Sequence, residues 1–146
     1  MRWVWLPTLR ELRVRPRLTH QTNLKEMPFM KEISFYKTDS GNCPVEDFLD
    51  SLSGKQAQKV IWVLKLIEEL KMPPAQYLKK LVNTDDIWEV RIQLGNNIFR
   101  LLGFFENEEL LILNHGFVKK TQKTPSQEIE MAESRQKDYL NRKNKL

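Results

Sequence analysis

The amino-acid sequence predicts an α+β fold, RelE-like in its order β-α-α-β-β-β-α, in which a mostly antiparallel sheet packs on a pair of helices. Three observations predict this class. Two amphipathic helical patterns follow a first strand-like run. Three alternating runs then follow one another with short turns between them, which is typical of an antiparallel meander. Strong start signals near residue 124 predict a last helix.

One strand and two helices are expected in the first half of the fold. Lys31–Lys37 alternates apolar and polar residues and is predicted to be a strand. A turn over Thr38–Cys43 precedes Pro44, which suits the first position of a helix and is followed by acidic residues. Apolar residues three and four apart predict a second helix over Lys55–Lys71. The Met-Pro-Pro run at residues 72–74 ends it.

The meander occupies the second half. Residues 75–86 are expected to form a loop, and Ile87–Leu94 then alternates as a strand with one apolar and one polar face. The Gly-Asn-Asn run at residues 95–97 is a hairpin signal. Two further strand-like runs, Ile98–Phe105 and Glu109–Val118, complete the meander.

The final helix has the clearest predicted start. Thr124 is expected to be its N-cap, with Pro125 at the first helical position and Gln127 three residues after the cap. A basic tail follows the helix.

Composition limits the class of protein. The chain has 146 residues, enough for one domain, and no apolar run approaches the roughly 20 residues needed to cross a bilayer. Its single cysteine, Cys43, excludes an internal disulfide and favours a reducing, cytoplasmic compartment. The net charge of +5 is unevenly spread. Residues 31–114 hold ten basic and thirteen acidic residues, whereas residues 115–146 hold eight basic and four acidic ones.

The first thirty residues do not resemble the rest. They carry six basic and two acidic residues, and prolines at positions 7, 16 and 28 prevent a continuous helix. We interpret residues 1–30 as a basic extension outside the fold, with translation starting at Met27 or Met30. A basic arm that touches RNA or a membrane is the alternative. The domain is then expected over residues 31–146.

His115 is the titrating side chain that the sequence singles out, because it stands just before a run of lysines. Cleavage of RNA without a metal needs a base near the 2′-hydroxyl, an acid for the departing 5′-oxygen and positive charge around the phosphorus. An imidazole can take either proton role. Arg91 and Arg100 lie on neighbouring predicted strands and could hold the phosphate. Taken alone, the same residues also fit a structural imidazole and two arginines paired with carboxylates.

Five more residues are candidates for binding RNA. Phe117 could stack on an unpaired base. Lys119 and Lys120 follow the last predicted strand, and Lys79 and Lys80 lie in the predicted loop, where the ordinary alternative is solvated lysines. The sequence contains no glycine-rich phosphate loop and no metal-ligand cluster at useful spacing, so no cofactor or metal is expected.

The order of these residues resembles the RelE/HigB toxins of bacterial type II toxin–antitoxin systems, within the RelE/ParE superfamily. The closest likeness is to their phage-derived, HigB-type branch. It is carried by W-E-V-R at residues 88–91, F-R at residues 99–100 and H-G-F-V-K-K-T-Q-K-T-P at residues 115–125. The likeness covers roughly residues 31–139.

The resemblance implies an endoribonuclease that cleaves mRNA on the ribosome by metal-free 2′-hydroxyl attack and so inhibits translation. It also implies a cognate antitoxin, often a helix-turn-helix protein, that silences the toxin in a hetero-oligomer. By position, His115 is the general acid or base, and Arg91 and Arg100 stabilise the phosphate and the transition state. Lys119 and Lys120 then bind ribosomal or messenger phosphate.

Two other functions stay open from the sequence. The same fold serves ParE toxins, which inhibit DNA gyrase, and fold alone does not decide function. The chain could also be an inactive partner of a DNA-binding antitoxin. The paired strand arginines and the H-G-F-x-K-K signature favour the nuclease. Glu89 stands where certain relatives have a lysine, which shifts the expected proton transfer to His115.

Overall fold

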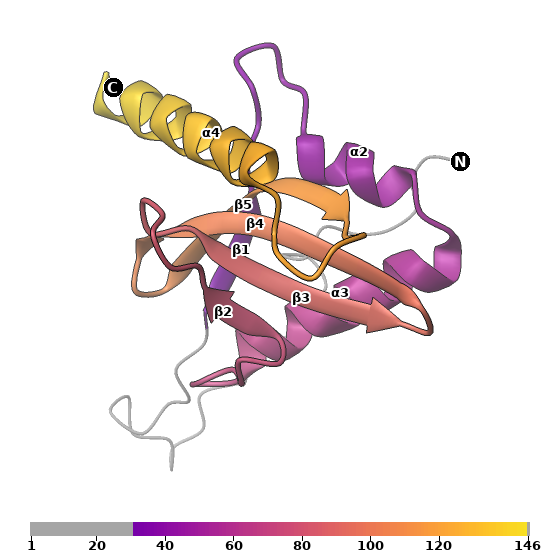
Figure 1. Ribbon diagram of the computed structural model, residues 1–146. Helices are drawn as coiled ribbons and strands as arrows, with labels where there is room; N and C mark the ends of the chain where they lie inside the picture. The colour runs from indigo at the N-terminus through magenta and orange to yellow at the C-terminus, as the bar shows by residue number, and fades with distance from the viewer. Residues whose placement is uncertain (1–30, 146) are drawn as a thin grey trace, which may run out of the picture.

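The centre of the fold is the antiparallel meander that the alternating runs predict. The computed structural model describes residues 31–145, and Figure 1 shows a sheet with helices on both faces. The meander consists of β3 (Trp88–Leu94), β4 (Asn97–Asn107) and β5 (Leu110–Val118). The predicted α+β class and element order are confirmed. The predicted basic extension, residues 1–30, lies outside the described residues.

Two short strands flank the meander. β1 (Glu32–Phe35) is the first predicted strand, shortened at both ends, and lies parallel to β5. β2 (Leu78–Lys80) lies antiparallel to β3, so the strand order is β1-β5-β4-β3-β2. The expectation that residues 75–86 form only a loop is therefore wrong. Three residues are too few to produce a recognisable alternation, and this strand depends on a distant partner.

Helices cover the two faces of the sheet. Figure 1 shows α4 (Ser126–Asn144) across one face, whereas α2 (Pro44–Asp50) and α3 (Gly54–Glu69) pack on the other. A capping box starts α3: the Ser53 hydroxyl accepts from the backbone N–H of Gln56 at 3.2 Å, and the Gln56 side chain accepts from the backbone N–H of Ser53 at 3.0 Å. The main core lies between the sheet and α2 and α3. Its buried side chains include Val45, Leu49, Val60, Val63, Leu64, Ile67, Val90, Ile92, Phe99, Leu101, Leu111 and Leu113.

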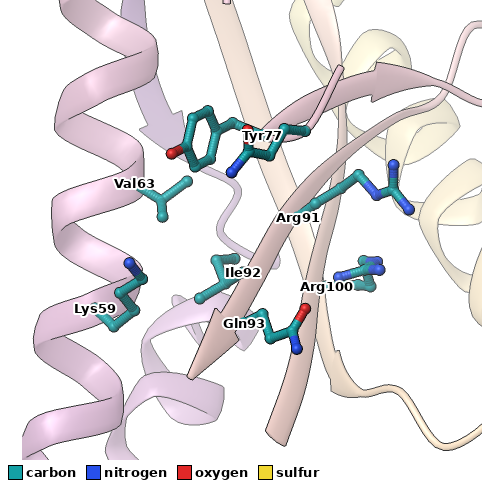
Figure 2. A pocket seen from close by; sticks show the side chains of 8 residues that line it. Lys59, Val63, Tyr77, Arg91, Ile92, Gln93 and Arg100 are labelled. Carbon is teal, nitrogen blue, oxygen red and sulfur yellow. The ribbon is translucent and has the colours of Figure 1, made fainter. Parts of the chain in front are cut away.

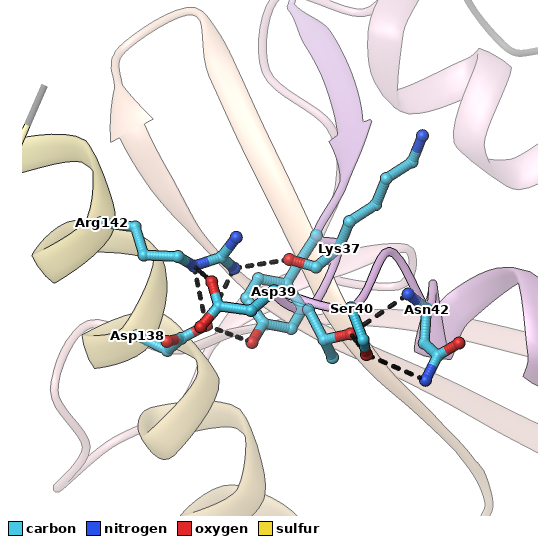
Figure 3. A network of polar contacts seen from close by, with 8 residues as sticks. Lys37, Asp39, Ser40, Asn42, Asp138 and Arg142 are labelled. Atoms are coloured by element: carbon cyan, nitrogen blue, oxygen red, sulfur yellow. Dashed lines mark hydrogen bonds and ion pairs between the residues drawn. The ribbon is translucent and has the colours of Figure 1, made fainter.

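A polar network fastens the C-terminal half of α4 to the segment after β1. Figure 3 shows Arg142 reaching from α4 toward this segment. Its guanidinium lies 3.2 Å from the carboxylate of Asp39 and 2.8 Å from that of Asp138, and it donates to the carbonyl oxygen of Lys37. The hydroxyl of Tyr36 also donates to Asp138. These contacts hold α4 against the sheet from the end opposite to the predicted site.

The N-terminus of α4 differs from its prediction. Its N-cap is Pro125, and no side chain caps the helix. The hydroxyl of Thr124 instead donates a hydrogen bond of 2.6 Å to the carboxylate of Glu89, and both residues are buried. The prediction of Thr124 as an N-cap is wrong because the helix begins one residue later, with Pro125 at the N-cap, and the bond to Glu89 holds the Thr124 side chain instead.

A β-bulge between β4 and β5 decides which residues face α4. Leu102 pairs with His115 but Gly103 pairs with Leu113, so Asn114 is an extra residue on β5. Because of this extra residue, Asn114 and His115 both turn toward α4. Strict alternation would place His115 on the same face as Leu113, inside the main core.

Gly103 allows the strands to approach at this bulge. A Cβ atom there would overlap the carbonyl oxygen of Ile112 and lie 2.8 Å from the Cα of Leu113. These are backbone atoms, which cannot rotate away as a side chain can.

We therefore expect Gly103→Ala to lower the free energy of unfolding by at least about 1–3 kcal/mol. Gly54→Ala is the matched control, because nothing lies within 4 Å of a Cβ at that position. The control is expected to be neutral or slightly stabilising. Urea unfolding measures both variants, and equal stability of the two would contradict the need for glycine at the bulge.

Candidate nucleic-acid interface

Two arginines stand opposite each other on the face of the sheet that carries α4. Arg91 of β3 pairs in register with Arg100 of β4, and Arg100 pairs with Phe117 of β5. Alternation places all three on one face, away from the main core. The bulge adds His115 to the same face. The structure thus places four residues that the sequence singled out on one face of the sheet.

A buried carboxylate lies between the two arginines. Oε1 of Glu89 is 3.4 Å from Nε of Arg100 and 3.6 Å from Nε of Arg91, while its Oε2 accepts from Thr124. The Arg100 contact is an ion pair without hydrogen-bond geometry. The Glu89 and Arg100 side chains are only 3% and 8% exposed, so water screens this pair little. Burial lowers the pKa of the Arg100 guanidinium, and the charge of Glu89 opposes that shift.

The arginines line a depression that we call the basic hollow. It has a volume of about 660 Å³, and its lining includes Arg91, Arg100, Lys119 and Lys120. Partial burial lowers the pKa of Lys119, and the positive charges of Arg100, Arg91 and Lys79 lower it further. The share of this shift that comes from the neighbouring charges shows that several cations lie close together. The basic hollow can therefore hold an anion, and guanidinium groups match the geometry of a phosphate.

The two lysines of β2 differ in their surroundings. Lys79 is exposed, and its charge reaches Lys119, so it extends the positive field of the basic hollow. Lys80 Nζ lies 2.9 Å from the carboxylate of Asp86. Its charge is therefore partly neutralised by a partner on the same surface.

His115 lies beneath α4 and does not line the basic hollow. Its Nε2 is 2.5 Å from a carboxylate oxygen of Glu128, and its Nδ1 is 3.1 Å from Nη1 of Arg135. Because arginine only donates, Nδ1 is the acceptor and Nε2 carries the proton that is donated to Glu128. Burial lowers the pKa of His115; Glu128 opposes the shift and Arg135 reinforces it. The ring stacks on Phe117, with centroids 5.7 Å apart.

Sequence reasoning missed Glu128 and Arg135. Both lie on α4 and contact the same imidazole. Their separation of seven residues, two helical turns, would have placed them on one face of the predicted helix. Nothing in the sequence indicates that this helix crosses His115.

The comparison with known families identifies the chain. A profile of the phage-derived Gp49-like proteins (DUF891) matches residues 47–137, which is more than half of the chain. The chain belongs to the Gp49-like family. This is a family of RelE/HigB-like toxin-type proteins, which agrees with the resemblance at the level of the family. No curated protein matches the chain significantly.

In this Gp49-like protein, no helix within residues 31–145 is long and apolar enough to cross a membrane. Over the same described range, no three His, Cys, Asp or Glu side chains are grouped so that they could hold a metal ion.

The buried ion cluster predicts a large effect of Glu89→Gln. Removing the anion leaves two guanidiniums facing each other with no buried counter-charge, so the free energy of unfolding should fall by about 3 kcal/mol. Asp86→Asn is the control, because it removes a carboxylate from an exposed pair and should cost less than about 1 kcal/mol. Asparagine also tolerates the positive φ of Asp86, which is 60°. Similar urea midpoints for the two variants would contradict a structural role of Glu89.

The His115 environment predicts a dependence of stability on pH. The folded-state pKa lies below the ordinary value of 6.5, so the unfolded chain binds the proton more readily. The contribution of His115 is therefore complete above pH 6.5 and is lost as the pH falls through the folded-state value.

We expect the urea midpoint to fall more steeply on acidification in the wild type than in His115→Gln. Unfolding at a series of pH values from about 7 to 5 measures the difference between the two proteins. The opposite sign, a wild type that gains stability relative to His115→Gln, would mean that Glu128 holds a charged imidazolium.

Proposed function

We propose that this chain is the toxin of a type II toxin–antitoxin system, of the HigB-type branch, and that it cleaves mRNA on the ribosome. The observation that carries this proposal is the basic hollow, in which Arg91, Arg100 and Lys119 converge beside the buried Glu89. Membership of the Gp49-like family supports a toxin, and the chemistry of these side chains supports RNA as its target.

The reaction is the attack of a ribose 2′-oxygen on the adjacent phosphorus. The new bond forms between the 2′-oxygen and phosphorus, and the bond from phosphorus to the 5′-oxygen breaks, leaving a 2′,3′-cyclic phosphate and a 5′-hydroxyl. Arg91 and Arg100 would stabilise the negative charge that develops on the phosphate oxygens. Lys119 and Lys120 would hold the neighbouring phosphates, with Lys79 at the margin and Lys80 available only when it leaves Asp86.

His115 is the proposed general acid or base, with a condition that its contacts impose. Both of its ring nitrogens are engaged by α4, so proton exchange with RNA requires release of Glu128 or Arg135. Phe117, stacked on the imidazole, would then offer its ring to a base of the message.

The proposed partners follow from the same activity. The chain would act in the cytoplasm on the ribosome and its mRNA. A cognate antitoxin, expected to be a helix-turn-helix protein, would silence it within a hetero-oligomer.

The test is induced expression in bacteria from a tight promoter, with mRNA 5′ ends mapped after induction. We expect growth arrest and new cuts within translated frames. Arg91→Ala and Arg100→Ala should each lower cleavage about 100-fold or more, because each removes a group that stabilises transition-state charge. Arg100→Lys distinguishes a loss of stability from a loss of catalysis. It keeps a cation beside Glu89 but loses the planar guanidinium that binds two phosphate oxygens at once. Lys137→Ala, an exposed cation on α4, is the control and should cleave normally.

His115→Ala is expected to lower cleavage at least 100-fold if the imidazole transfers a proton. A loss below about tenfold would restrict His115 to holding α4 in place. Growth arrest without cuts would favour inhibition of DNA gyrase, and no arrest would indicate an inactive partner of an antitoxin; either result overturns the proposal.

A further inference from the structure

A second depression lies across the open edge of β3, and we call it the edge hollow. β2 pairs only with Trp88–Val90, so within residues 31–145 the later part of β3 has no outer strand beside it. The edge hollow has a volume of about 280 Å³. Figure 2 shows Lys59 of α3 on one side of β3, and Arg91 and Arg100 on the other. It therefore joins the α3 side of the sheet to the side that carries the basic hollow.

An aromatic pair borders the edge hollow. Tyr77 lines it and meets Trp62 of α3 edge to face, with ring centroids 6.1 Å apart. Lys59, which also lines it, places its Nζ 4.4 Å from the centre of the Trp62 ring. Trp62 is 49% exposed, a large fraction for a tryptophan that belongs to no binding site. A half-exposed indole beside a tyrosine and a lysine is suited to stacking on a base.

The two hollows share their arginines. Arg91 and Arg100 line both of them. The backbone also ties the aromatic side to the basic side, because the N–H of Arg91 donates to the carbonyl oxygen of Tyr77 at 2.8 Å. Nη1 of Arg91 donates to the carbonyl oxygen of Ala75 at 3.3 Å, which turns its guanidinium toward this junction. One strand that follows both hollows would therefore pass over Arg91.

We propose that the edge hollow, together with the Trp62 ring at its border, is a second binding site for the same RNA. Trp62 stacks on an unpaired base, Tyr77 lies edge to face beside that stack, and Lys59 holds the adjacent phosphate. The inference rests on the proposed function, since Arg91 and Arg100 would carry the neighbouring phosphate in the basic hollow. The site would prefer single-stranded RNA, because only an unpaired nucleotide can turn its base onto the aromatic pair. It would tolerate any base, since the stacking surface offers a ring face rather than a set pattern of hydrogen bonds.

Charge favours RNA over a protein partner at this site. The lining of the edge hollow contains three cationic residues, Lys59, Arg91 and Arg100, and no acidic residue. The basic hollow is likewise lined without an acidic residue. A path of cations with an aromatic pair at one end is the arrangement that binds single-stranded nucleic acid.

The test measures binding of the full chain to a fluorescent oligouridine with 2′-O-methyl riboses, which cannot undergo 2′-hydroxyl attack. Trp62→Ala should weaken binding roughly 5- to 150-fold, the range for loss of one stacked base. Trp62→Phe should recover most of it. Met131→Ala is the matched control and should bind like the wild type. Met131 is exposed and apolar, as Trp62 is, but it lies away from both hollows.

Two further measurements, the salt dependence of the affinity and the binding of an abasic strand, distinguish the contribution of base stacking from that of charge. Lys59→Gln should reduce the slope of log affinity against log salt by about 0.7, whereas Trp62→Ala should leave the slope unchanged. Lys55→Gln, on the same helix but outside the hollow, is the control for Lys59. An abasic strand of the same length and charge should bind the wild type and Trp62→Ala equally well.

The outcomes distinguish this inference from the proposed function. If Arg100→Lys weakens binding but Trp62→Ala does not, the edge hollow holds no base and only this inference fails. If the wild type binds neither oligouridine nor the abasic strand, this inference fails. The proposed function concerns mRNA on the ribosome and is decided separately by the cuts mapped after induction. If Trp62→Ala leaves RNA binding intact and weakens binding of polyglutamate, the surface serves an acidic protein partner and the inference is overturned.

Discussion

The candidate site depends on one buried carboxylate. Arg91 and Arg100 face each other across two strands, and two guanidiniums in that position repel unless an anion lies between them. Glu89 is that anion, and its second oxygen accepts from Thr124 at the entrance to α4. A single side chain therefore sets the spacing of the arginines and anchors the segment that follows Lys119. Loss of this anion would disturb the sheet and the basic segment together.

α4 divides into two parts the face of the sheet that carries Arg91, Arg100 and His115. Its N-terminal half covers His115 and holds both nitrogens of the imidazole, while its C-terminal half is fastened through Arg142. The arginines and Lys119 lie beyond the helix and line the basic hollow. Phosphate binding can thus occur with every contact of α4 in place, whereas proton transfer by His115 requires release of Glu128 or Arg135. In the proposed chemistry, phosphate binding and proton transfer therefore depend differently on the contacts that α4 makes.

In the proposed binding mode, the two hollows together would give an RNA strand a longer path than the basic hollow alone. They meet at Arg91, whose backbone is bonded to Tyr77 and whose side chain lies beside Arg100. The basic hollow supplies charge and the edge hollow supplies aromatic surface, and single-stranded RNA needs both for tight, sequence-tolerant binding. The short length of β2 makes this possible, because a longer strand would cover the edge of β3.

The sequence by itself determined β1, the three strands of the meander, the helices and the position of Arg91 and Arg100 on neighbouring strands. Periods of two and of three to four residues are local properties of the chain. Only the tertiary structure decided which face of the sheet His115 lies on. That side depends on the bulge at Asn114, where Gly103 lets β4 approach the carbonyl oxygen of Ile112. The pairing of β2, the bond from Thr124 to Glu89 and the edge hollow likewise join segments far apart in the chain. Such contacts leave no periodic signal, since each depends on where a distant backbone or carboxylate lies after folding.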